Sequence, residues 1–233
     1  MINGKQHPFI KWIDKKIHAE KSNCVVMIDG WPGSGKSYGA LDLCQTFDPK
    51  FNINYVAFTL LDVMKILKHC AKTGERGRAI MLDEAGVAGN SKRFMAKESQ
   101  MYEEILRMMR FLGNLFVTTS PNFGDYLKSA RQLADVRIIF EKSQKLVAAK
   151  KKGYTFAELR MLSFGKYDGK VYSTRLRISP SEEIATIRFD MPPKDLIKDY
   201  ENAKQDNFLS NIEANIKEIE QNQYNKYLKN TLS

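Results

Sequence analysis

A glycine-rich loop over Gly30–Ser37, with the sequence GWPGSGKS, constrains this chain more than any other feature. It fits the pattern G-x-x-x-x-G-K-[S/T], follows the apolar run Cys24–Ile28 and precedes Tyr38–Cys44, whose apolar residues have helical spacing. This context predicts a buried strand, a tight loop and a helix. Glycines let the backbone N–H groups of such a loop converge on phosphate oxygens, and the N-terminus of the following helix adds its dipole. The sequence therefore predicts a nucleoside triphosphate site.

Two side chains of this loop have defined chemistry. Lys36 is predicted to reach the β- and γ-phosphates of ATP, and the Ser37 hydroxyl to hold Mg²⁺. The alternative is a plain Gly/Ser turn between a strand and a helix, but all fixed positions of the pattern are present. The predicted nucleotide contacts are Gly30, Trp31, Pro32, Gly33, Ser34, Gly35, Lys36, Ser37 and Tyr38.

Composition describes a globular chain with an excess of positive charge. Of the 233 residues, 43% are hydrophobic, and no apolar run reaches the roughly 20 residues that span a bilayer. The polar segment Met1–Lys11 lacks the apolar centre of a signal peptide. The three cysteines have no metal-ligand spacing and predict buried thiols in a reducing cytoplasm, prokaryotic or that of a virus-infected host cell. A net charge of +10 favours a polyanionic partner besides ATP.

Strands and helices are predicted to alternate up to about residue 140. Further strands are expected at Asn54–Phe58, Arg78–Leu82, Leu115–Thr119 and Val136–Phe140. The alternation predicts an α/β fold with a mostly parallel sheet and helices on both faces. The expected organisation is an N-terminal helix over 1–21, a nucleotide-binding core over 22–141, a basic β-hairpin appendage over 142–191 and a C-terminal helical tail over 192–233.

Polar residues at the ends of two predicted strands supply candidates for hydrolysis. Asp83 is placed to meet Mg²⁺ through its water shell, and Glu84 to activate water as general base. The alternative is a plain exposed strand end. Thr119 or Ser120, at the end of the fourth strand, is the candidate sensor of the γ-phosphate, unless these residues only cap the strand.

Arginines can neutralise charge that develops on the transferred phosphoryl group. Arg93, Arg107, Arg110 and Arg131 are expected near the nucleotide edge, with Arg110 and Arg131 as first candidates for a residue supplied to a neighbouring subunit. The alternative for each is a solvated surface position.

The stretch 142–177 is strongly basic, with ten lysines and arginines against two acidic residues. Strands are expected at Thr155–Phe164, Val171–Ile178 and Ile184–Phe189, the first two joined by a turn at 167–169. A hairpin with one basic face suits a nucleic-acid backbone, whereas the alternative is a hairpin that charge merely keeps soluble. The candidate contacts are Lys145, Lys150, Lys151, Lys152, Arg160, Arg175 and Arg177.

The last stretch, from about Asp206, carries a thin apolar line formed by Ile212, Ile216 and Ile219. It predicts a solvated helix, a helix that binds a protein partner, or a partly frayed segment.

These motifs together resemble the additional-strand P-loop ATPases. The resemblance covers about Ser22–Phe140 and rests on GWPGSGKS, AIMLDEAGVAGNSKRF and RMMRFLGNLFVTTSPNF. Within this superfamily the chain is most similar to HerA–FtsK-type DNA-pumping motors and to zonula occludens toxin-like ATPases of viruses and mobile elements. The resemblance implies a RecA-like strand order of 5-1-4-3-2, Walker A roles for Lys36 and Ser37, Walker B roles for Asp83 and Glu84, and a homo-oligomeric ring. Many pumping motors have Gln at the end of the fourth strand, where this chain has Thr-Thr-Ser.

The first functional hypothesis is an ATP-driven motor that translocates or packages double-stranded DNA of a virus or mobile element. The second is an ATP-dependent assembly or morphogenesis factor that acts on protein partners. A P-loop kinase is disfavoured because Glu84 suits activation of water. A GTPase is disfavoured because no Asn-Lys-x-Asp sequence occurs.

Overall fold

The computed structural model describes residues 7–84, 92–141, 153–179 and 182–231, and of 92–99, 178–179 and 223–231 only the backbone. The chain divides into two compact units, Met1–Pro193 and Lys194–Ser233. Among the described residues, no helix has both the length and the apolar character needed to cross a membrane.

The first unit is built on a parallel sheet with the predicted strand order. Its five core strands follow one another across the sheet as β5-β1-β4-β3-β2, and each neighbouring pair is parallel. The prediction of a 5-1-4-3-2 sheet is therefore confirmed. The bounds are β1 (Cys24–Gly30), β2 (Val56–Ala57), β3 (Ala79–Leu82), β4 (Leu115–Ser120) and β5 (Val136–Phe140).

The second strand is shorter than expected. Residues Ile53–Tyr55 form a 3-10 turn, η3, instead of extended chain, because the Asn52 side chain caps this turn by accepting the N–H of Asn54. Only Val56 and Ala57 then remain to pair with β3.

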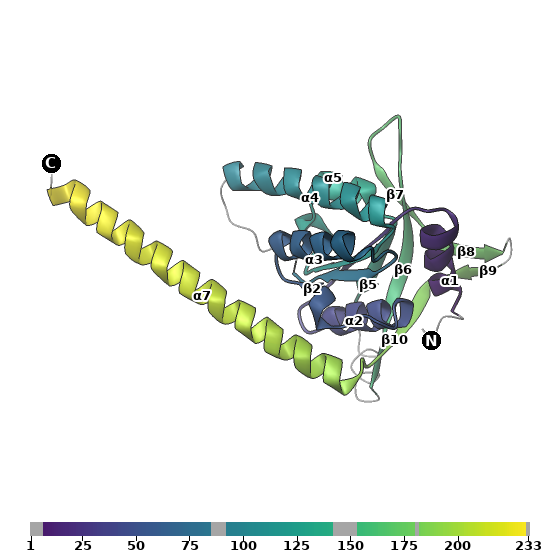
Figure 1. Cartoon of the computed structure of the whole chain (residues 1–233). Coiled ribbons are helices and arrows are strands. Elements are labelled where there is room, and N and C mark those ends of the chain that lie inside the picture. Colours follow the sequence, from purple (N-terminus) through teal and green to yellow (C-terminus); the bar gives the residue numbers. More distant parts are fainter. Residues whose placement is uncertain (1–6, 85–91, 142–152, 180–181, 232–233) are drawn as a thin grey trace. The chain divides into compact units, whose positions relative to one another are not determined.

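Helices lie on both faces of this sheet (Figure 1). Phe140 of β5 points toward α2, while Phe116 of β4 contacts Tyr102 of α4, so these two helices cover opposite faces. Thr59 and Gly74 cap α3: the Thr59 hydroxyl accepts the N–H of Asp62, and Gly74 has a left-handed conformation. The helices are α1 (Pro8–Asp14), continued by the π-helix η2 (Lys15–Ala19), α2 (Lys36–Phe47), α3 (Leu60–Thr73), α4 (Lys92–Leu112), η4 (Phe123–Asp125) and α5 (Lys128–Leu133).

The described part of the basic region joins the main sheet through antiparallel strands. The strands β6 (Tyr154–Phe164) and β10 (Thr186–Asp190) extend the main sheet beyond β5 as antiparallel neighbours, and β7 (Val171–Thr174) pairs with β6. Alternate residues of β6 such as Ala157 and Leu159 are buried, and Phe189 of β10 stacks on Phe140. These residues therefore belong to the same hydrophobic core as the parallel strands.

The predicted strand Val171–Ile178 is interrupted at Arg175. Tyr172 and Thr174 are exposed, whereas Leu176, which would share their face in a continuous strand, is buried. The chain turns at Arg175 and continues as β8 (Leu176–Ser179), which pairs with β9 (Glu182–Ile184) in a small second sheet.

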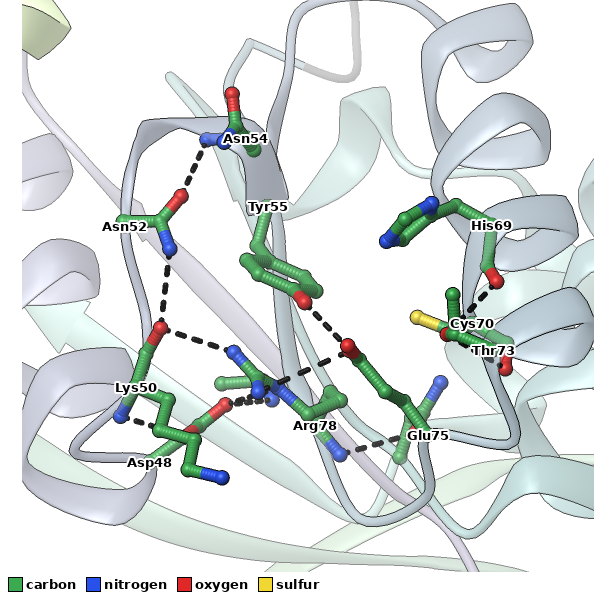
Figure 2. A network of polar contacts seen from close by, with 12 residues as sticks. Asp48, Lys50, Asn52, Asn54, Tyr55, His69, Cys70, Thr73, Glu75 and Arg78 are labelled. Atoms are coloured by element: carbon green, nitrogen blue, oxygen red, sulfur yellow. Dashed lines mark hydrogen bonds and ion pairs between the residues drawn. The ribbon is translucent and has the colours of Figure 1, made fainter.

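A buried ion network holds the β2–β3 side of the unit together (Figure 2). Arg78 is only 8% exposed, lies 2.8 Å from Asp48 and stacks 4.1 Å above the Tyr55 ring. The Tyr55 hydroxyl donates to Glu75, and Asp48 also accepts the N–H of Ala79 at 3.2 Å. Since β3 begins at Ala79, this network fixes the amino end of the strand whose carboxyl end carries Asp83.

The second unit is one long helix, α7 (Lys194–Thr231). Its exposed apolar residues include Phe208 and Leu209 together with the predicted line of Ile212, Ile216 and Ile219.

Candidate active site

The predicted phosphate loop has the backbone that its glycines allow. Gly30, Gly33 and Gly35 all have positive φ, and Gly35, with φ of 101°, is the residue directly before α2. Gly30 is required for a second reason: a Cβ there would lie 2.2 Å from the carbonyl oxygen of Phe140. The strand β5 therefore presses directly against the start of the loop.

Two polar groups of the loop suit phosphate binding. The Lys36 ammonium donates a hydrogen bond of 3.0 Å to the carbonyl oxygen of Trp31, so it reaches across the loop. The Ser34 hydroxyl is buried without a hydrogen-bond partner in the described part of the chain. A buried donor of this kind is unfavourable unless a ligand satisfies it, and a phosphate oxygen would do so.

Asp83 and Ser37, the two residues expected at the metal site, meet beside the loop. Ser37 Oγ donates to Asp83 Oδ1 at 2.9 Å, and Asp83 is 1% exposed at the end of β3. A hydroxyl and a carboxylate are the oxygen ligands that Mg²⁺ prefers, and Mg²⁺ takes its remaining ligands from phosphates and water. The donor set fits that ion.

Thr119 joins the same cluster and contacts Glu84. Its Oγ1 donates to Asp83 Oδ1 at 2.7 Å and accepts the backbone N–H of Glu84 at 2.9 Å. Glu84 itself is exposed and has φ of 55°, a left-handed conformation that non-glycine residues rarely adopt. The strand end thus presents a buried carboxylate and an exposed one side by side.

Ser120, the other candidate sensor, is not brought to this cluster. Consecutive residues of a strand point to opposite faces, so Ser120 lies on the face away from Ser37. Its hydroxyl donates to Asp125 at 3.1 Å, within the capping box that Asn122 and Asp125 form around η4. The Ser120 hydroxyl therefore helps to hold the turn after β4.

The structure also corrects the expectation that Arg110 approaches the nucleotide edge. Arg110 lies in the last turn of α4, four residues before Asn114, whose carbonyl oxygen accepts the N–H of Cys24. Cys24 begins β1, whereas the phosphate loop follows the other end of that strand. Arg110 is thus at the edge opposite the loop, because α4 runs back along the sheet.

Arg131 lies on the loop side of the sheet, next to Arg137, which was not among the arginines expected near the nucleotide. The guanidinium groups of Arg131 and Arg137 lie 5.7 Å and 4.2 Å from the centre of the Phe123 ring, directly after β4. Arg137 also forms a fork with Asp29, with bonds of 2.7 Å and 2.8 Å, and this pairing raises the pKa of Arg137. The sequence signals for this ion pair were Arg137, a charged residue inside the apolar strand β5, and Asp29, an aspartate directly before the loop.

The described basic candidates for nucleic-acid contact are paired with carboxylates. Arg160 pairs with Glu158, while Arg175 and Arg177 lie 3.7 Å and 3.0 Å from Glu183. Glu183 follows the basic stretch in the sequence, and only the pairing of β8 with β9 brings it there. These ion pairs reduce the charge available to phosphates. Lys145, Lys150, Lys151 and Lys152 lie outside the described residues.

The sheet order, the loop between β1 and α2, and the meeting of Ser37 with Asp83 define an additional-strand P-loop NTPase fold. No protein-family profile and no curated protein matches the sequence.

The chain is similar to several solved structures. PCH-2 of C. elegans is 14% identical, with a TM-score of 0.43 over 59% of this chain and 42% of that one, so the match spans less than half of PCH-2. The genome packaging NTPase B204 of Sulfolobus turreted icosahedral virus 2, in complex with ATP-gammaS, is 16% identical, with a TM-score of 0.36 over 66% and 97%. The N-terminal domain of zonular occludens toxin from Neisseria meningitidis is 12% identical, with a TM-score of 0.38 over 67% and 96%.

Proposed function

We propose that this protein is an ATP-hydrolysing motor that translocates or packages double-stranded DNA. The observation that carries the ATPase part is the convergence of Ser37, Asp83 and Thr119 at the carboxyl ends of β3 and β4, directly beside the phosphate loop. In a 5-1-4-3-2 sheet this is the place where bound phosphates, a metal ion and an attacking water meet.

Each residue of the site has a separate role in hydrolysis. The loop N–H groups and the Lys36 ammonium bind the β- and γ-phosphates. Ser37 and Asp83 would hold Mg²⁺, which would neutralise charge on the phosphates. The exposed Glu84 carboxylate accepts a proton from the attacking water. Arg131 is the remaining first-ranked candidate for an arginine that acts on a neighbouring subunit's nucleotide, since it lies on the loop side of the sheet.

The DNA part rests on charge. The net charge is +10, and the stretch 142–177 carries most of that excess. Because Arg160, Arg175 and Arg177 are paired with carboxylates, we assign the phosphate contacts chiefly to the lysines at 145 and 150–152.

ATP turnover measured with and without double-stranded DNA, at low and at physiological salt, tests the proposal. We expect stimulation by DNA that weakens as salt rises, since counterion release drives phosphate contacts. Lys36→Ala is the control for contaminating ATPases, because it removes the phosphate-binding ammonium. Turnover that does not respond to DNA at either salt concentration would contradict the motor while leaving the ATPase in place.

One observation favours a second candidate, an ATP-dependent assembly factor that acts on proteins. The helix α7 exposes Phe208, Ile212 and Ile216, which recur at helical spacing. An exposed apolar line of this kind suits a protein partner. Serine substitutions at these three positions would leave DNA-stimulated turnover unchanged in the motor and would remove partner binding in the assembly factor.

A further inference from the structure

The hydroxyl of Thr119 forms two hydrogen bonds that determine what it can do. It donates its proton to Asp83 Oδ1 at 2.7 Å and accepts the backbone N–H of Glu84 at 2.9 Å. A threonine hydroxyl has one proton and two lone pairs, so its capacity to donate is used in full. The oxygens of a γ-phosphate accept hydrogen bonds, and a sensor of that phosphate must donate to them.

We propose that Thr119 is a positioning residue that sets the Glu84 carboxylate for catalysis, and is not a sensor of the γ-phosphate. The inference rests on the proposed ATPase function and adds to it the residue that orients the general base. It replaces the sensor role that the sequence predicts for this position.

The conformation of Glu84 explains why such a residue is needed. Its φ of 55° places it in the left-handed region, which is sterically unfavourable for a residue with a Cβ. The hydrogen bond from the Glu84 N–H to Thr119 holds this conformation. Without the bond, Glu84 can relax to ordinary backbone angles, and its carboxylate leaves its place.

The position of Thr119 in the sheet makes this possible. It lies opposite Ile28 of β1, and its predecessor Thr118 pairs with Leu82, the residue before Asp83. The side chain of Thr119 therefore stands between the loop strand and the strand that carries both carboxylates. Since Asp83 Oδ1 accepts the hydroxyls of Ser37 and Thr119, one chain of hydrogen bonds runs from the first turn of α2 to Glu84.

Substitutions at Thr119 test the role. Thr119→Val keeps the size and branching of the side chain and removes the hydroxyl, whereas Thr119→Ser keeps the hydroxyl. We expect kcat of Thr119→Val to fall roughly 10- to 100-fold, as for a misplaced catalytic group, with unchanged binding of ATP-gammaS and ADP. Thr119→Ser should recover most of the rate. Thr118→Val, a buried position on the opposite face of β4, controls for effects on folding.

A double-mutant cycle shows whether the effect passes through Glu84. In single-turnover assays, Thr119→Val in a Glu84→Gln background should cause no further loss, because the group that it positions is already gone. An additive loss would overturn the inference. A selective loss of ATP-gammaS affinity relative to ADP in Thr119→Val would also overturn it, since that is the signature of a sensor.

The outcomes separate this inference from the proposed function. If the wild-type protein turns over ATP and Thr119→Val turns it over equally fast, only the role of Thr119 fails. If the wild-type protein does not hydrolyse ATP, or if Lys36→Ala hydrolyses it equally fast, the ATPase proposal fails and the inference fails with it.

Discussion

Replacing Asp42 by asparagine should stabilise the fold at neutral and alkaline pH. Asp42 lies in α2, is 9% exposed, and accepts the backbone N–H of Asp190 at 3.1 Å. Burial, together with the nearby Asp190 carboxylate, raises the pKa of Asp42 from 3.8 to about 7, and the hydrogen bond from the Asp190 N–H opposes this rise. The folded protein therefore keeps a proton on Asp42 that the unfolded chain has already lost.

The sign and size of the effect follow from this difference in pKa. Below pH 3.8 both states are protonated and the penalty is absent. As the pH rises from 3.8 to about 7, the free energy of unfolding falls, because in this interval the folded state binds more protons than the unfolded one. Each pKa unit corresponds to about 1.4 kcal/mol, so the full penalty above this range is about 4 kcal/mol. Asparagine keeps the acceptor oxygen and has no charge to bury.

Urea unfolding followed by circular dichroism, at about pH 5 and about pH 8, measures this effect. The Asp42→Asn variant should exceed the wild type in free energy of unfolding at the higher pH by more than at the lower pH. Asp199→Asn, at an exposed position, is the matched control and should show no such dependence. An equal difference at both pH values would refute the reasoning, since an ordinary ionised Asp42 would produce that result.

Four further outcomes are expected. Lys36→Ala should abolish nucleotide binding or turnover, measured by calorimetry and phosphate release. Glu84→Gln should bind ATP normally and reduce hydrolysis to a residual rate that only single-turnover assays detect, and normal turnover would exclude Glu84 as general base. Arg78→Met should lower the free energy of unfolding by about 3 kcal/mol, because it leaves Asp48 buried without its ion pair; a loss below about 1 kcal/mol would contradict that reasoning. Neutralising the lysines at 150–152 should weaken DNA binding and flatten its salt dependence, and unchanged binding would exclude this cluster.

The sequence alone predicted the parts of the site whose residues lie close together in the chain. The loop Gly30–Ser37 and the pair Asp83–Glu84 each follow an apolar strand, so hydrophobic pattern and motif were sufficient to place them. The alternation of strands and helices predicted the parallel sheet, and the resemblance implied its 5-1-4-3-2 order.

The arrangement of the basic region could not be predicted from hydrophobic pattern and motif. Arg177 and Glu183 pair only because the chain turns at Arg175 and β8 joins β9. Leu176 after this turn is buried, whereas Tyr172 and Thr174 before it are exposed. The alternating hydrophobic pattern of Val171–Ile178 does not show whether the strand continues or ends at Arg175.

Tertiary structure also decided which polar residues work at the site. The sequence left Thr119 and Ser120 as equal candidates, and the register of β4 against β1 and β3 turned one toward Asp83 and the other toward Asp125. It likewise carried Arg110 to the far edge of the sheet and brought Arg137 to Asp29. Residue identities and local periodicity define loops, strands and helices. The donor and acceptor that a hydroxyl meets, and the charge that an arginine faces, depend on distances between strands that only the packed sheet sets.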